Sequence, residues 1–249
     1  MGRFPRPLFP CVALLMTLCG VPALAGDVEF SASSAFLSNY VWRGQRLSEG
    51  FVGQESATVG YKGFSATFWS NYDFEGTRWS EVDLTLAYAW ELGPLTLEAG
   101  YNYMGFFDQR SQELYVSGSL DTVLNPTLAV YVDVDAGKGG FLQAAVSHSF
   151  KLPRDATFDV GANVGFNLDN AYMGLDPSDE KFAGPYNAEL QVGFTFPLGK
   201  GFSLVPTAAC SIPLGDRAKH AIGAASVNGH STTVYGGVTL NWEKEGPRQ

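Results

Sequence analysis

Apolar and polar side chains alternate along this chain in segments of about ten residues, and that alternation limits the folds open to it. Residues 32–44 show it clearly: the even positions, such as Phe36 and Trp42, are largely apolar, and odd positions such as Arg43 are polar. A period of two belongs to a β-strand with one apolar and one polar face. We expect this stretch to be a strand that Gly44 ends, which puts Arg43 at the mouth of the enclosed space.

Eleven further segments repeat the pattern, which gives twelve in all. They are Val52 to Tyr61, Phe64 to Asp73, Glu81 to Trp90, Leu95 to Tyr103, Gln112 to Leu120, Thr127 to Asp135, Gly140 to Leu152, Thr157 to Leu168, Tyr186 to Phe196, Phe202 to Ile212 and Thr232 to Trp242. Short turns rich in Gly or Pro alternate with longer polar loops, above all Asp169 to Pro185 and Gly215 to Ser231. The prediction is an all-β fold: a single antiparallel transmembrane β-barrel of about 12 strands, with long extracellular loops, short periplasmic turns and no helix.

The aromatic residues favour this membrane barrel over a secreted β-sandwich. On the apolar faces, one group of rings is expected at the short-turn ends of the strands: Tyr61, Phe64, Tyr88, Trp90, Phe150, Phe158, Phe194, Phe196, Phe202 and Trp242. A second group is expected at the loop ends: Tyr40, Trp42, Tyr72, Tyr101, Tyr103, Phe166 and Tyr186. Aliphatic and small residues lie between them. Two aromatic belts around an aliphatic band match the two interfaces of a membrane, whereas a soluble core would mix rings through its middle.

The first 25 residues have the features of a signal peptide. Arg3 and Arg6 precede an apolar run, and Ala23-Leu24-Ala25 is an A-x-A cleavage site. We therefore expect residues 1–25 to be removed on export and residues 26–249 to form the outer-membrane barrel. Loss of the two arginines changes the formal net charge from -9 to -11, because every acidic residue lies in the mature part. This acidity argues against nucleic acid as a partner.

The first quarter of the mature chain resembles the TorF family of porin-like proteins. The resemblance is carried by Ser38-Asn39-Tyr40-Val41-Trp42-Arg43-Gly44, Ser48, Gln54, Gly60-Tyr61, Gly63 and Trp69-Ser70-Asn71-Tyr72-Asp73. That family combines a signal peptide with an outer-membrane barrel and has a Tyr-x-x-Arg-Gly element early in the mature chain. The resemblance implies a barrel in the outer membrane with pore activity.

The polar side chains at alternate positions of the strands are expected to line the lumen. Its charged residues are the acids Glu29, Asp83, Glu98, Glu113, Asp133, Asp135, Asp159 and Glu189 and the bases Arg43 and Lys151. Eight acids against two bases would attract cations and repel anions. The alternative is that the acids pair with Arg43, Lys151 and lumen hydroxyls and fill a plugged barrel. Arg43 itself either shapes entry at the mouth or forms a salt bridge to a neighbouring lumen acid that fixes the first strand.

An enzyme is not expected. Some outer-membrane barrels are lipid hydrolases, which need Ser and His side by side on the lipid face. His148 points outward in the expected register, but Ser147 and Ser149 point inward, so the nucleophile is missing. No cofactor is implied, and no metal site can be inferred because His220 and His230 lie far apart in one loop.

The function expected from the sequence is passive diffusion of small polar solutes, cationic or zwitterionic, through an outer-membrane channel. The competing hypothesis is a non-conducting structural barrel, or an adhesin-like barrel that uses the two long loops for surface contacts. The expected partners are outer-membrane lipid, the solutes and the barrel-assembly machinery during biogenesis. The sequence leaves the oligomeric state open.

Overall fold

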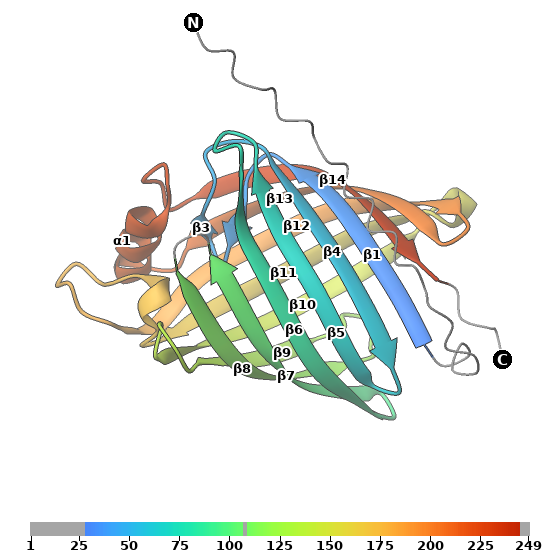
Figure 1. Cartoon of the computed structure of the whole chain (residues 1–249), viewed down its shortest axis with the longest axis horizontal. Coiled ribbons are helices and arrows are strands. Elements are labelled where there is room, and N and C mark those ends of the chain that lie inside the picture. Colours follow the sequence, from blue (N-terminus) through green and yellow to red (C-terminus); the bar gives the residue numbers. More distant parts are fainter. Residues whose placement is uncertain (1–27, 107–108, 245–249) are drawn as a thin grey trace, which may run out of the picture.

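Twelve antiparallel strands close on themselves into a barrel, in the order β1-β14-β13-β12-β11-β10-β9-β8-β7-β6-β5-β4 (Figure 1). The computed structural model describes residues 28–106 and 109–244. The expected signal peptide, residues 1–25, lies outside the described residues. Among the described residues, each wall strand pairs with its neighbour along the chain, and β1 closes the barrel by pairing with β14, for instance Phe36 with Val238.

The wall strands match the expected segments closely. They are β1 (Val28–Leu37), β4 (Val52–Tyr61), β5 (Phe64–Asp73), β6 (Arg78–Leu92), β7 (Leu95–Phe106), β8 (Arg110–Leu120), β9 (Thr127–Asp133), β10 (Gly139–Lys151), β11 (Thr157–Leu168), β12 (Ala183–Gly199), β13 (Phe202–Pro213) and β14 (Thr233–Glu243). A short 3-10 turn, η1 (Pro153–Asp155), joins β10 to β11. The closed twelve-stranded barrel is therefore confirmed. The longest connections, those before β4, β12 and β14, all lie at one end, but the other connections at that end are about as short as the turns at the opposite end.

The outward side chains form an aliphatic band. Leu86, Val116 and Leu190 leave 48%, 57% and 55% of their surface exposed, because they point away from the barrel interior. Such exposure would be costly in water but is the expected state against lipid chains. Closure also satisfies the backbone hydrogen bonds of every wall strand, which a membrane requires.

The aromatic belt at the turn end has the expected composition. Its rings contact one another around the barrel: Phe64 lies 4.4 Å from Tyr88, and Phe158 lies 5.1 Å from Phe194 between ring centroids. The belt at the loop end differs from the prediction. Its contacts join Phe36, Phe51, Tyr72, Phe74 and Trp79. The predicted outward positions of Tyr40, Trp42 and Tyr186 are wrong, because Tyr40 and Tyr186 are buried and Trp42 packs against the buried cluster that contains Tyr186.

The first expected strand is wrong beyond Leu37. The chain leaves the wall there and forms a small hairpin of β2 (Val41–Trp42) and β3 (Gln45–Arg46). Between these strands Arg43 and Gly44 have φ angles of 48° and 86°. Positive φ at both central residues is the requirement of a type I′ hairpin turn, and glycine adopts it readily. The Arg-Gly pair therefore turns the chain inside the barrel instead of ending a wall strand.

The expectation of no helix is also wrong. The predicted loop Gly215 to Ser231 contains α1 (Asp216–Ala225), which buries Ala218, Ala221 and Ile222. These positions have the i, i+3, i+4 spacing of a helix face, but two of the three are alanines, so the apolar signal in the sequence is weak. The loop before β12 contains a 3-10 turn, η2 (Ala171–Met173). Over residues 28–106 and 109–244, no helix is long and apolar enough to cross a membrane.

We call the β2–β3 hairpin, η2 and α1 together the plug, because they fill the loop end of the barrel. Their apolar side chains share one buried cluster with the wall: Phe141, Met173, Phe182, Tyr186, Ala218, Ala221 and Ile222. Hydrogen bonds tie the hairpin to η2, to wall strand β12 and to the segment that follows α1. Gln45 Nε2 donates to the Tyr172 carbonyl and to Tyr186 Oη, both at 2.8 Å, and the Val227 amide donates to the Arg46 carbonyl at 2.9 Å. The two long loops therefore fold over the barrel end.

Replacing Gly44 with Ala should loosen the hairpin without opening the barrel. A Cβ at Gly44 would lie 3.0 Å from Asn187 Cβ and 3.3 Å from Ser211 Oγ, and the φ of +86° is already unfavourable for Ala. Left-handed backbone at a residue with a Cβ costs about 1–2 kcal/mol, and the close approach adds to it. We expect faster tryptic cleavage after Arg43 and Arg46, mapped by mass spectrometry, with an unchanged heat-dependent gel shift of the barrel.

Gly199→Ala is the matched control. Gly199 has a φ of +84°, but a Cβ there would meet nothing within 4 Å, and the residue lies at the turn end. This variant carries the same backbone strain without the contact to the wall. If it exposed Arg43 and Arg46 to trypsin as much as Gly44→Ala does, the close approach of Gly44 to Asn187 and Ser211 would not be what places the hairpin.

Candidate functional site

Three neighbouring cavities lie inside the barrel, one beneath the other from the loop end. The outer cavity, of about 580 Å³, lies between the plug and strands β6 and β7. The middle cavity, of about 450 Å³, shares Trp42 with the outer one. The inner cavity, of about 320 Å³, continues from the middle one and shares Thr85, Asn102, Tyr131 and Gln143 with it. The linings combine polar with aromatic and aliphatic side chains, and we call the three cavities together the path, which is the candidate site.

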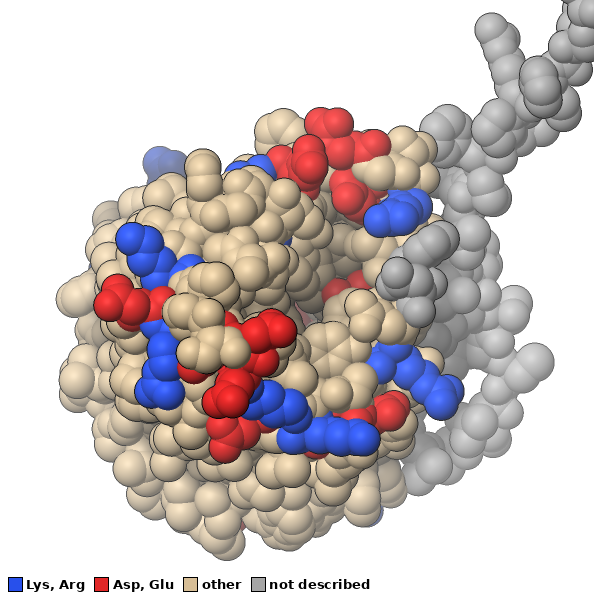
Figure 2. Space-filling view, turned by 90° about the vertical axis from the view of Figure 1, so that its left-hand side faces the viewer, with Lys and Arg blue, Asp and Glu red and all other residues tan. Residues whose placement is uncertain are grey.

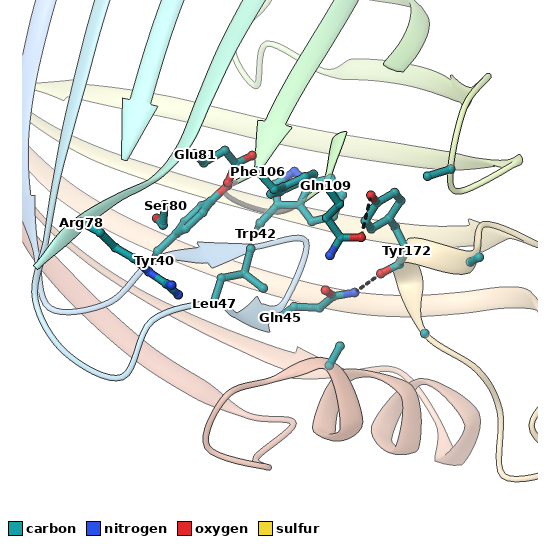
Figure 3. Close-up of a pocket in the computed structure, with 14 residues that line it drawn as sticks. Tyr40, Trp42, Gln45, Leu47, Arg78, Ser80, Glu81, Phe106, Gln109 and Tyr172 are labelled. Carbon is teal, nitrogen blue, oxygen red and sulfur yellow. Dashed lines mark hydrogen bonds between the residues drawn. The ribbon is translucent and has the colours of Figure 1, made fainter. Parts of the chain in front are cut away.

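The outer cavity combines aromatic rings with one buried acid. Figure 3 shows Tyr40, Trp42, Phe106 and Tyr172 around it, with the Tyr40 hydroxyl pointing at the Glu81 carboxyl. Burial and the neighbouring Glu81 raise the pKa of the Tyr40 phenol well above 10.0, so Tyr40 is a neutral donor. Figure 2 looks onto this end of the molecule, where basic and acidic side chains both surround a recess. The entrance is therefore of mixed charge.

Arg43 lies inside the barrel and not at its mouth. Both guanidinium NH2 groups donate to the Glu113 carboxylate of β8, at 2.7 and 2.9 Å. Three rings surround the guanidinium, those of Trp42, Tyr131 and Phe141, with centroids 4.5 to 4.7 Å from its carbon. The two side chains are only 9% and 2% exposed. The sequence allowed a salt bridge to a neighbouring acid, but the partner lies across the barrel, so the bond fixes the hairpin and not the first strand.

Three further acids line the middle and inner cavities. Their hydrogen-bond donors are neutral groups, and Asp83 also lies within hydrogen-bonding reach of Glu81. Asp83 accepts a hydrogen bond from the Gly105 amide at 3.2 Å, and Glu98 accepts one from Tyr115 Oη at 2.7 Å. Glu189 accepts from Tyr235 Oη at 3.0 Å. Among the described residues that line these two cavities, Arg43 is the one Lys or Arg, and Glu113 already compensates it. The path therefore has a surplus of negative charge.

The other five expected lumen residues lie near the two barrel ends, and the cavity linings, as far as the chain is described, include none of them. Glu29 and Lys151 are exposed at the turn end, and Asp159 there accepts from the hydroxyls of Thr157 and Thr195. At the loop end, Asp133 is buried and shapes the turn that follows β9.

Asp135 does not point into the lumen as the alternation predicted. Strand β9 ends at Asp133, so the alternation does not extend two residues further. Asp133 Oδ1 accepts from the backbone amides of Asp135, Gly137 and Lys138, and this bends the chain. Asp135 instead accepts from Gln112 Nε2 at 3.0 Å and lies 3.9 Å from Arg110 Nε, so it does not face the cavities.

Sequence reasoning missed several residues of the path. Glu81 has the same parity as Asp83 on β6, so the alternation already contained the signal for it. Gln45 follows the Arg-Gly pair, and an X-Gly pair between alternating residues is itself a hairpin signal. Tyr172 lies in an irregular loop, where no periodic pattern could identify it.

Removing the charge of Arg43 should destabilise the protein, and removing both charges should restore most of the loss. Arg43→Met would leave the Glu113 carboxylate buried without its cation, a change that costs about 3–5 kcal/mol in comparable buried pairs. In Arg43→Met with Glu113→Gln, no charge is left unpaired. We would measure the free energy of unfolding in urea for the refolded single and double variants. Additive losses in the double variant would show that the two side chains do not act as a pair.

Comparison with known proteins places the fold but not a family. No family model matches the chain, and no curated protein matches it, so the resemblance to the TorF family stays a prediction. Solved structures are similar in fold. The NanC porin has 14% sequence identity and a TM-score of 0.54, over 87% of this chain and 99% of that chain. The KdgM porin has 10% sequence identity and a TM-score of 0.55, over 85% of this chain and 98% of that chain. The structure of KdgM in complex with disordered oligogalacturonate has 9% sequence identity and a TM-score of 0.53, over 86% of this chain and 98% of that chain. This chain has the barrel fold of those porins.

Proposed function

We propose that this protein is an outer-membrane channel for passive diffusion of small polar solutes, with a preference for cations and zwitterions. The single observation that carries the proposal is the series of neighbouring cavities, of about 580, 450 and 320 Å³, that lie one beneath the other inside a closed barrel and are lined by polar and aromatic side chains. A lipid-facing exterior and a polar, hollow interior are the two features that a β-barrel channel needs. The fold that the chain shares with the NanC and KdgM porins supports the same function.

The proposed preference for cations rests on the charges along the path. Asp83, Glu98 and Glu189 face the cavities, whereas the charge of Arg43 is neutralised by Glu113. A ring of carboxylates in a narrow polar passage raises the local concentration of cations and lowers that of anions. KdgM was solved with oligogalacturonate, which carries a carboxylate on each sugar unit. The acidic path proposed here would repel such a solute.

The proposed size limit follows from the plug. Trp42 lies between the outer and middle cavities, and Arg43 is held immediately beneath it by Glu113 and three rings. A solute must pass this point, so we propose that small solutes cross and large oligomers do not. We further propose that the short turns face the periplasm and that the barrel-assembly machinery inserts the chain, as the sequence led us to expect.

The test is ion conductance of the refolded protein in a planar bilayer under a potassium chloride gradient. We expect steady conductance and a reversal potential on the cation-selective side. In Glu98→Gln with Glu189→Gln, selectivity should fall by at least about twofold per charge, since one unit charge about 8 Å from an ion in water changes its energy by about 0.5 kcal/mol. High salt should weaken the selectivity of the native protein.

Glu55→Gln is the matched control for this measurement. Glu55 lies on β4 but is exposed on the outer surface, where it accepts a hydrogen bond from Ser34 Oγ at 2.8 Å. Its charge is separated from the path by the barrel wall, so its loss should leave the reversal potential unchanged. A folded barrel without conductance would overturn the channel and favour the non-conducting alternative, and an anion-selective reversal would overturn the charge preference.

A further inference from the structure

Two acids face each other across the middle cavity, Asp83 on β6 and Glu189 on β12. In the closed order of the twelve wall strands, β6 and β12 are six strands apart in either direction, so they form opposite walls of the barrel. The cavity between them has a volume of about 450 Å³, which falls within the usual range for binding pockets of small molecules. A guest in this cavity would therefore meet one acid at each end.

The Asp83 end of the cavity carries one negative charge. Asp83 accepts a hydrogen bond from the Gly105 amide at 3.2 Å and lies within hydrogen-bonding reach of Glu81, two residues before it on β6. Two carboxyl groups this close repel each other when both are ionised, so one of them keeps its proton at neutral pH. The pair of Glu81 and Asp83 therefore contributes one negative charge and not two, and Asp83 is the member that lines the middle cavity.

The Glu189 end carries a second carboxylate and an acceptor without a donor. Glu189 accepts hydrogen bonds from two neutral groups, Tyr235 Oη and Asn163 Nδ2, at 3.0 and 3.4 Å. Asn187, on the same strand, lines the same cavity and is 3% exposed, and its Oδ1 atom has no hydrogen-bond partner among the described residues. An unsatisfied buried acceptor is costly, and a guest with N–H groups would remove that cost.

The positive charge in the cavity is neutralised at a side wall. Glu113 on β8 binds the Arg43 guanidinium at 2.7 and 2.9 Å, and the ring of Tyr131 on β9 lies 4.7 Å from its carbon. Strands β8 and β9 belong to the wall between β6 and β12, so Arg43 is held to one side of the cavity. The guanidinium also lies against the Trp42 ring. A guest is therefore held by charge and hydrogen bonds more than by stacking on these rings.

We infer that the middle cavity is a binding site for linear aliphatic diamines, with one primary ammonium group at Asp83 and the other at Glu189. This inference rests on the proposed function and narrows it, since it gives the transported cation a chemical class. A primary ammonium group has three N–H donors, which match the carboxylate oxygens and the Asn187 Oδ1 atom. The methylene chain between the two ammonium groups can pack against Val41 and Met104, two apolar side chains of the lining.

Two other guests fit the cavity less well. A divalent metal ion carries both charges at one point, so it cannot neutralise acids on opposite walls at once. Such an ion also takes several oxygen ligands, and no group of three or more His, Cys, Asp or Glu side chains in the described part of the chain is placed to hold one. A monoamine would neutralise one acid and leave the acid on the other wall uncompensated.

The experiment measures binding to the full-length mature protein, refolded in detergent, by titration calorimetry. The ligands are the linear diamines from 1,3-diaminopropane to 1,8-diaminooctane, the N-permethylated analogue of each, which has the same charge and length, and the monoamine butylamine. We expect saturable binding with one best chain length, because a linker works only when its length matches the span between two sites. The best diamine should bind at least about tenfold more tightly than butylamine and than its permethylated analogue, which has no N–H donors.

Two variants test the two ends of the site separately. Asp83→Asn and Glu189→Gln each remove one charge and keep a hydrogen-bond acceptor, so the barrel should fold, which its heat-dependent gel shift checks. Each variant should weaken binding of the best diamine by about tenfold and abolish the preference for one chain length, since one end remains. Glu55→Gln on the outer surface is the control and should bind the diamines as the native protein does.

The outcomes separate this site from the channel function. Affinity that follows charge alone, with no best chain length in the native protein, would show a simple counterion and would overturn the diamine site. A loss in one variant with no change in the other would overturn it too, because the guest would then touch one wall only. Conductance without diamine binding would reject the site and leave the channel standing. Diamine binding in a barrel that does not conduct would reject the channel, because calorimetry reads binding without any current.

Discussion

The structure depends on closure of the barrel by β1 and β14. These strands pair from Ser31 with Glu243 to Leu37 with Gly237, and without this pairing two strand edges would face lipid with unsatisfied backbone groups. Closure also sets where the wall stops. Beyond Leu37 the chain turns inward, and the Ser38 amide still donates to the Gly236 carbonyl at 2.8 Å as it leaves. The hairpin and the cavities beneath it exist because the wall ends at this residue.

The hairpin brings a charge into the barrel, and its surroundings are built to hold that charge. A buried guanidinium loses its hydration, which one bidentate carboxylate and three ring faces replace for Arg43. Buried pairs of this kind add little net stability, but they strongly disfavour any arrangement that separates them. The pair of Arg43 and Glu113 therefore specifies the position of the hairpin more than it stabilises the barrel. The hydrogen bonds from Gln45 to Tyr172 and Tyr186 also fix the position of the hairpin.

The sequence predicted the wall well because a wall strand repeats one physical requirement every two residues. Strands β4, β5 and β11 begin and end at the residues expected from the alternation. The rings expected at the turn end also contact one another there. The interior of the loop end follows another logic. The run from Tyr40 to Arg43 continues the alternation, so only the Arg-Gly turn signal separates it from a wall strand. Helix α1 buries small alanines that give almost no hydrophobic contrast. The lumen position predicted for Asp135 fails for a similar reason, because β9 ends at Asp133 and side chains no longer alternate between the two faces beyond it.

The same contact that positions the constriction also sets the charge of the path. Arg43 is the one base among the described side chains that line the middle cavity, and its positive charge is neutralised by the Glu113 carboxylate. Asp83, Glu98 and Glu189 must then be compensated by water, by protons or by mobile cations, because none of them has a base as partner: their donors are a backbone amide, phenol hydroxyls and the Asn163 amide. A hairpin held by neutral contacts alone would have left Glu113 as a further uncompensated acid. A hairpin with a second free base would have reversed the field. One base bound to one acid narrows the barrel and keeps its interior acidic.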